Sequence, residues 1–193
     1  MGEGKNRAAR LGVWRNGLSD AEQVVVRAAT QTYERFIVAA QATGMCYRMA
    51  FFLSTYLQRE HSITAPAVVG YVHDGTGDVM TSHAWIEFNG KKTDISLTMT
   101  DEPSVQLQGQ LLVLDQVLKN GHAYTYHRAQ NEAALRALEA IYADPRLRHL
   151  SARKDREHEM MSDIARDPER VLAFLNGAPD GFDYATLVHT CRL

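Results

Sequence analysis

The chain has 193 residues, 45% of them hydrophobic, which is typical of one folded domain. Its 21 basic and 23 acidic residues leave a formal net charge of −2, which excludes the strong field that favours nucleic acid or an anionic membrane as a partner. No apolar stretch approaches the roughly 20 residues of a membrane span or follows the basic N-terminus as a secretory signal would, so we expect a cytoplasmic protein. Residues 1–17 are expected to form a flexible basic arm.

Two helices are predicted in the first third of the chain. The sequence Ser19-Asp20-Ala21-Glu22 is a capping box, which predicts a helix start, and apolar residues recur at helical spacing to about residue 42. Gly44 interrupts this pattern. A second helix is predicted from Cys46 to near Glu60, because apolar residues again recur at helical spacing. Cys46 is therefore expected at a helix start.

An antiparallel hairpin is predicted next. Alternating and β-branched residues over 63–73 indicate a strand. Two further strand-like runs, residues 82–88 and 91–97, flank Asn89-Gly90, and Asn-Gly between two such runs is a strong hairpin signal. A two-residue loop would pair Phe88 with Lys91.

The register of this hairpin would bring polar side chains together. Continued along the strands, it pairs His83 with Ser96 and Trp85 with Asp94, and all four side chains would project from one face of the sheet. His83 and Asp94 would be diagonal neighbours, roughly 7–8 Å apart at the backbone. At that separation an imidazole can donate a hydrogen bond to a carboxylate.

The rest of the chain is predicted to hold strands followed by helices. Residues 109–127 are rich in aromatic and β-branched residues around Asn120-Gly121, which favours strands, although the first half would also suit a helix. From Asn131 the pattern is helical, with breaks at Asp144-Pro145 and Asp167-Pro168.

This order of elements predicts an α+β class. We expect a core over residues 18–130 and a C-terminal helical extension of the same domain over residues 131–193. Seven basic and seven acidic residues between Asp144 and Arg170 indicate a solvated, salt-bridged surface rather than a binding patch. His158, within this run, is expected on a solvated helix face.

The chain has only two cysteines, Cys46 and Cys191, too few for a disulfide framework or a four-thiolate zinc site. His122 and His127 would lie on opposite faces of a strand without an acidic residue at metal-site spacing, so neither a metal nor a cofactor is expected. A bond between the two cysteines remains an alternative, as does a buried, unreactive Cys46.

A helix start favours a third role for Cys46, that of a nucleophile. Unsatisfied backbone amides and the helix dipole stabilise a thiolate, and in known reactive cysteines such effects lower the pKa of the thiol from about 8.5 to roughly 3.5–7.5. The backbone amide of Cys46 is also a natural donor to an oxyanion. Gln41 and Tyr47 are candidates for the second donor.

Cys46, His83 and Asp94 are the residue types of a nucleophile, a general base and an orienting carboxylate. Each alone has an ordinary structural explanation, and their joint placement is what favours catalysis. Trp85 and Tyr47 are candidate substrate-binding residues, with packing as the alternative for Trp85.

Residues 40–98 resemble the transglutaminase-like superfamily of papain-like thiol enzymes. The matching residues, in chain order, are Gly44-Met45-Cys46-Tyr47-Arg48-Met49-Ala50, Val68-Val69-Gly70-Tyr71, His83-Ala84-Trp85-Ile86-Glu87 and Asp94. The resemblance implies a papain-like core in which a helix packs on an antiparallel sheet, with Cys46 as nucleophile, His83 as base and Asp94 as orienting acid. A small bacterial-type enzyme is the nearer likeness, because the paired CxxC zinc motif of the peptide N-glycanase branch and the long C-terminal β domain of animal transglutaminases are lacking.

The sequence thus predicts a thiol-dependent acyl-transfer enzyme, a cysteine peptidase or amidase that acts on a peptide or protein amide through an acyl-enzyme. Two alternatives stay open. One is a transglutaminase or acyltransferase that uses an amine acceptor, and the other is a non-catalytic peptide-binding module of the same fold.

Overall fold

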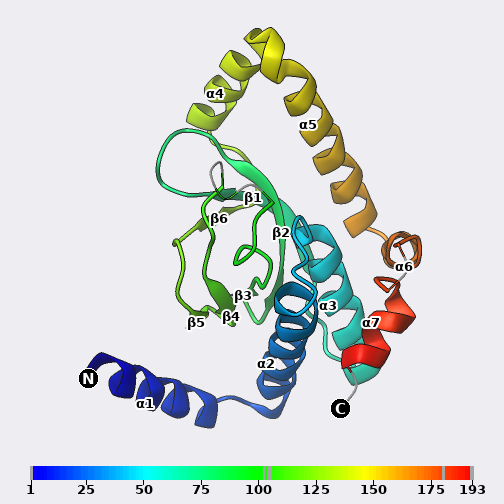
Figure 1. The fold of residues 1–193 in the computed structure, drawn as a ribbon. Coiled ribbons are helices and arrows are strands. Elements are labelled where there is room, and N and C mark those ends of the chain that lie inside the picture. The colour runs from blue at the N-terminus through cyan, green and yellow to red at the C-terminus, as the bar shows by residue number, and fades with distance from the viewer. Residues whose placement is uncertain (1, 102, 104–105, 180, 192–193) are drawn as a thin grey trace.

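A computed structural model describes residues 2–101, 103, 106–179 and 181–191, and it has the predicted α+β class (Figure 1). In chain order the elements are α1 (Gly2–Asn16), α2 (Asp20–Thr32), the π-helical turn η1 (Tyr33–Val38), α3 (Cys46–His61), β1 (Ala67–His73), β2 (Thr81–Phe88), β3 (Lys91–Thr93), β4 (Leu111–Val113), β5 (Gln116–Lys119), β6 (Thr125–His127), α4 (Glu132–Ala143), α5 (Pro145–Ala165), α6 (Pro168–Asn176) and α7 (Tyr184–Cys191). In this part of the chain, none of the helices combines the length and the apolar composition of a transmembrane span.

Gly2–Asn16, within the segment 1–17 that the sequence predicts to be a flexible basic arm, form the helix α1. The sequence Ala8-Ala9-Arg10-Leu11 at the centre of α1 consists of strong helix formers, and Arg7 Nη2 donates a hydrogen bond of 2.9 Å to the carbonyl oxygen of Leu118 in β5. The expected boundaries of the core and of the C-terminal extension stay predictions.

The capping box at the start of α2 is confirmed. Ser19 Oγ accepts a hydrogen bond from the backbone amide of Glu22, and the Glu22 carboxylate accepts one from the backbone amide of Ser19 at 2.9 Å. The helical segment ends with η1 at Val38 rather than near residue 42. Gly44 follows in the left-handed region at φ +63°, where a Cβ would lie 2.7 Å from a carboxylate oxygen of Asp101, so only glycine fits between η1 and α3.

α3 is the central helix of the core. It packs on α2, β1, β2, α6 and α7, and Phe51, Phe52 and Leu57 along it are fully buried. Burying a side chain of this size contributes roughly 1.5–3 kcal/mol relative to leaving it in water. The helix that carries Cys46 at its N-terminus is therefore held by apolar contacts from Tyr47 to Leu57.

The larger sheet has the antiparallel order β3-β2-β1-β6. The hairpin between β2 and β3 has the predicted register for its first three pairs, from Phe88 with Lys91 to Ile86 with Thr93. Alternate residues divide as expected: Ala84 and Ile86 enter the hydrophobic core, whereas Trp85 packs on Tyr126 of β6 across the opposite face, with ring centroids 5.2 Å apart.

The hairpin ladder ends earlier than predicted. β3 stops at Thr93, so Trp85 does not pair with Asp94, nor His83 with Ser96. Asp94 instead forms an isolated antiparallel bridge with Leu112 of β4. Its side chain accepts a hydrogen bond of 3.0 Å from the backbone amide of Ser96, which turns the chain away from β2.

The strands predicted between residues 109 and 127 are present as β4, β5 and β6. β4 and β5 form a separate two-stranded sheet. Their tight turn lies at Leu114-Asp115, both with positive φ, rather than at Asn120-Gly121. β6 pairs with β1 and completes the larger sheet on the side away from β3.

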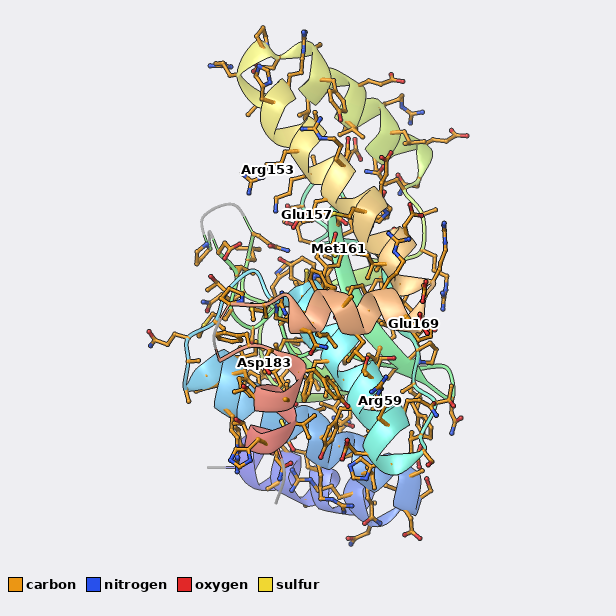
Figure 2. All side chains as sticks on the ribbon, turned by 90° about the vertical axis from the view of Figure 1, so that its right-hand side faces the viewer. Arg59, Arg153, Glu157, Met161, Glu169 and Asp183 are labelled. Atoms are coloured by element: carbon orange, nitrogen blue, oxygen red, sulfur yellow. The ribbon has the colours of Figure 1, made fainter. Side chains whose placement is uncertain are left out.

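The C-terminal helices begin where the two Asp-Pro sequences predict. Asp144 and Asp167 cap α5 and α6, each with proline in the first turn. α6 packs on α3, whereas α4 packs on α5 and forms with it a helical hairpin above the sheet (Figure 1). Figure 2 shows α5 descending from Arg153, past Glu157, to Met161, which is buried where the helix meets the core.

Candidate active site

The N-terminus of α3 presents Cys46. The first turn of a helix leaves backbone amides unpaired unless a side chain caps them, and Met45, which precedes the helix, provides no side-chain cap. The first turn also holds no acidic residue. Cys46, a partly exposed residue, thus lies at the uncapped, positive end of the helix dipole.

His83 and Asp94 lie in contact, as the sequence predicted. His83 Nε2 is 2.7 Å from Asp94 Oδ2, and the two side chains are only 4% and 1% exposed. The contact forms although the predicted backbone pairing around Asp94 does not, because Asp94 still follows the hairpin and keeps its side chain on the face that carries His83. Excluding water from this pair strengthens its electrostatic attraction.

Asp94 is fully hydrogen-bonded. Oδ1 accepts bonds of 3.0 Å from both the backbone amide and the hydroxyl of Ser96. Oδ2 accepts from His83 and, at 2.9 Å, from the hydroxyl of Tyr126. Burial would raise the pKa of Asp94, but the charge of His83 and these hydrogen bonds outweigh it and hold the pKa below its usual value. Asp94 is therefore a carboxylate at neutral pH.

His83 links Asp94 to Cys46. Burial acts to lower the pKa of His83, but the charge of Asp94 and its hydrogen bond outweigh this effect. The neighbouring side chain of Cys46 raises the pKa of His83 further, to about 10. Because Nε2 faces Asp94, Nδ1 is the ring nitrogen left for Cys46. The three residues thus lie in the order sulfur, imidazole, carboxylate.

A second set of polar contacts joins the neighbours of the triad to α5. The hydroxyls of Tyr47 and Ser82, next in the chain to Cys46 and His83, are 2.6 Å apart. Ser82 Oγ also hydrogen-bonds with Nδ1 of His158, whose ring stacks on Tyr71 with centroids 4.4 Å apart. His158 is therefore half-buried against the sheet, which corrects its expected place on a solvated face.

A cavity of about 540 Å³ opens at the triad. On the core side its lining includes Cys46, Tyr47, Ser82 and His83, and on the opposite side it includes residues of α4 and α5. A volume of this size is within the range of sites for small ligands or a few residues of a peptide. The nucleophile and the base thus face a space that a substrate can enter.

The other residues that the sequence singled out lie in different places. Trp85 is 2% exposed, donates a hydrogen bond of 3.0 Å from Nε1 to Glu87 and does not line the cavity, so its surroundings favour the packing alternative. Tyr47 lines the cavity, and Gln41 does not. Neither cysteine is in a disulfide; Cys191 is buried and lies 3.5 Å from the hydroxyl of Thr32.

The described residues do not include a cluster of metal ligands. Within the described ranges, no cluster of three or more His, Cys, Asp or Glu side chains is arranged to hold a metal ion. The buried polar side chains at the triad bond to one another instead.

Sequence reasoning missed Tyr126, Ser82 and His158. The strand that carries Tyr126 was predicted, but no local sequence pattern indicates that β6 pairs with β1. This pairing is what brings Tyr126 to Asp94. Ser82 directly precedes the candidate base, which is a weak signal for a role beside it. The charged residues around His158 in the sequence indicated solvent exposure, so its contact with Ser82 was not predicted.

The chain matches no protein-family model, and comparison with curated proteins and with solved structures also yields no significant match. What the site can do therefore follows from its own geometry.

Proposed function

We propose that the protein is a thiol-dependent acyl-transfer enzyme, a cysteine peptidase or amidase with Cys46, His83 and Asp94 as its triad. The observation that carries the proposal is the position of His83, which hydrogen-bonds with a buried, fully bonded carboxylate and lines the same cavity as Cys46. A buried structural cysteine does not need such a partner. We also propose that the core is papain-like, with a nucleophile-bearing helix packed on the antiparallel sheet that carries the base.

The first half of the reaction forms an acyl-enzyme. His83 holds the proton of Cys46, and the thiolate attacks the carbonyl carbon of the substrate to form a carbon–sulfur bond. The oxygen that gains charge accepts hydrogen bonds from free amides at the start of α3. The carbon–nitrogen bond then breaks, and the amine leaves with the proton from His83 Nδ1.

The second half releases the acyl group. Water gives a proton to His83 as its oxygen attacks the acyl carbon, and the carbon–sulfur bond breaks to regenerate the thiolate and the imidazolium. Asp94 stays ionised throughout and keeps the imidazole oriented, while Ser96 and Tyr126 orient Asp94. We propose hydrolysis rather than transfer because no feature among the described residues of the site marks a pocket for an amine acceptor.

Alkylation by iodoacetamide tests the nucleophile directly. In the intact protein at neutral pH, Cys46 should react at least about tenfold faster than free cysteine, and Cys46→Ala should abolish this labelling. In His83→Gln, Cys46 should react no faster than free cysteine while the protein stays folded. Cys191, buried in the same molecule, is the internal control and should react slowly.

Two outcomes separate the alternatives. If Cys46 reacts no faster than free cysteine, the enzyme proposal is wrong and a binding module becomes the better explanation. If a cleaved peptide amide yields an amine adduct in the presence of added amine, the activity is transfer rather than hydrolysis.

A further inference from the structure

The cavity at Cys46 has a polar end and an apolar end. We call the side chains of Cys46, His83, Tyr47 and Ser82 the polar end of the cavity. The apolar end is lined by Leu138 and Ile141 of α4, Leu147 of α5, and Val79 and Met99 of the core. The apolar end is therefore formed jointly by the helical hairpin of α4 and α5 and by the core.

Large apolar side chains at this end stay in contact with water. Val79 is 54% exposed and Leu147 is 43% exposed, yet both face the same cavity from opposite sides. Apolar surface of this kind gains free energy when an apolar group covers it. Because the nucleophile lines the same cavity, the natural occupant is part of the substrate of Cys46.

The cavity lining also carries three acidic and two basic side chains: Asp101, Asp155, Glu157, Arg153 and Lys154. Lys154 Nζ lies 3.3 Å from a carboxylate oxygen of Glu157, and the carboxylate of Asp155 accepts a hydrogen bond from the hydroxyl of Tyr142. Because these opposite charges nearly balance, little net charge is left to attract an ionic group, and the aliphatic surface becomes the stronger basis for recognition.

We propose that the substrate carries an apolar side chain or acyl group next to the carbonyl that Cys46 attacks, and that this group lies between the helical hairpin and the core. The inference rests on the proposed function and names its substrate class. Leu138, Ile141 and Leu147 are then specificity-determining residues on one wall, and Val79 is their counterpart on the other.

A pair of alkylating reagents tests this without a known substrate. Iodoacetamide has no tail, whereas N-hexyl iodoacetamide carries six methylene or methyl carbons that can enter the apolar end. Each carbon that is buried should raise the rate roughly fourfold, so the ratio of the two rates at Cys46 should exceed the ratio for free cysteine by at least about tenfold. The ratio cancels any change in the reactivity of the sulfur itself.

Matched substitutions on α4 show which residues raise the ratio of the two alkylation rates. Leu138→Gln and Ile141→Gln should each lower the ratio severalfold, whereas Leu135→Gln should leave it unchanged, because Leu135 is 48% exposed on the same helix and does not line the cavity. Val79→Asn tests the opposite wall from an exposed loop, where a substitution does not disturb helix packing. Circular dichroism confirms that each variant is folded.

The outcomes distinguish the two proposals. If the ratio of the two alkylation rates at Cys46 equals the ratio for free cysteine, the proposed apolar substrate class is wrong. It is also wrong if Leu135→Gln lowers this ratio as much as Leu138→Gln and Ile141→Gln do. If Cys46 reacts with iodoacetamide no faster than free cysteine does, the proposed function is wrong. The ratio of the two alkylation rates can still be measured in that case, because both slow reactions can be followed to completion.

Discussion

The hydroxyl of Tyr126 donates a hydrogen bond of 2.9 Å to Oδ2 of Asp94, the same oxygen that faces His83. The phenol and the imidazole thus share one acceptor, and the position of the acid depends on a strand that is remote in the sequence. Burial and the neighbouring charge of Asp94 raise the pKa of Tyr126 far above its usual value, so its hydroxyl remains a donor at any pH the fold tolerates.

Tyr126→Phe removes this donor and keeps the ring that packs on Trp85. Because a hydrogen bond to a charged group contributes roughly 1.5–3 kcal/mol, we expect a loss of free energy of unfolding of that order in urea denaturation. Alkylation of Cys46 should slow as the carboxylate loses its orientation. Tyr124→Phe, which removes a hydroxyl bonded to the carbonyl oxygen of Leu107, is the control and should not slow alkylation.

The ion pair of His83 and Asp94 makes stability depend on pH in both directions. His83 binds its proton more tightly in the folded state, since its pKa is raised to about 10. Its stabilising contribution is therefore complete below about pH 6.5, its pKa in an unfolded chain, and is lost as the pH rises towards 10. Asp94, whose pKa is lowered, contributes above about pH 4 and loses its contribution as the pH falls below that value.

Urea denaturation of the wild type and of His83→Gln measures this dependence. Between about pH 6 and about pH 9 the wild type should lose more free energy of unfolding than the variant, because only the wild type carries the histidine proton. Parallel curves for the two proteins would contradict the ion pair.

His158→Phe tests the contacts that fasten α5 to the catalytic sheet. The new ring can still stack on Tyr71 but cannot hydrogen-bond with Ser82, so we expect a loss of about 0.5–1.5 kcal/mol in free energy of unfolding and faster hydrogen exchange in α5. His149→Phe, at an exposed position of the same helix, should change neither quantity. Equal effects of the two substitutions would show that the contact with Ser82 does not hold the helix.

Gly70→Ala tests how closely β1 is packed beside the site. A Cβ at Gly70, which pairs with His83, would lie 2.4 Å from the carbonyl oxygen of His127 and 2.8 Å from the ring of Trp85. We expect a loss of roughly 1–3 kcal/mol in thermal or urea denaturation, as for other overpacked sites. Gly77→Ala has open space around it and should be nearly neutral.

Local signals in the sequence were sufficient where neighbouring residues determine the structure. The capping box at Ser19 and the Asn89-Gly90 turn were read from four and two adjacent residues, and both are confirmed. The turn also set the register that led to the contact between His83 and Asp94. The end of β3 was missed because it depends on a hydrogen bond between the Asp94 side chain and Ser96 and on pairing with Leu112.

Contacts between segments that are distant in the chain could not be predicted from the sequence. The pairing of β6 with β1 places Tyr126 at Asp94, and the docking of α5 places His158 at Ser82. Neither depends on periodicity or turn chemistry, because both result from how whole elements pack. α1 was missed for a different reason, since its charges outweighed the helix-forming residues at its centre.

The backbone bridge between Asp94 and Leu112 joins the triad to the small β4–β5 sheet, with bonds of 2.8 and 3.0 Å in the two directions. Asp94 is thus held through its main chain by one sheet and through its side chain by the other. Local opening of β4 and β5 would release the carboxylate without disturbing the central helix. In hydrogen exchange, the amides of Asp94 and Leu112 should open as one cooperative unit, distinct from the more protected amides of α3.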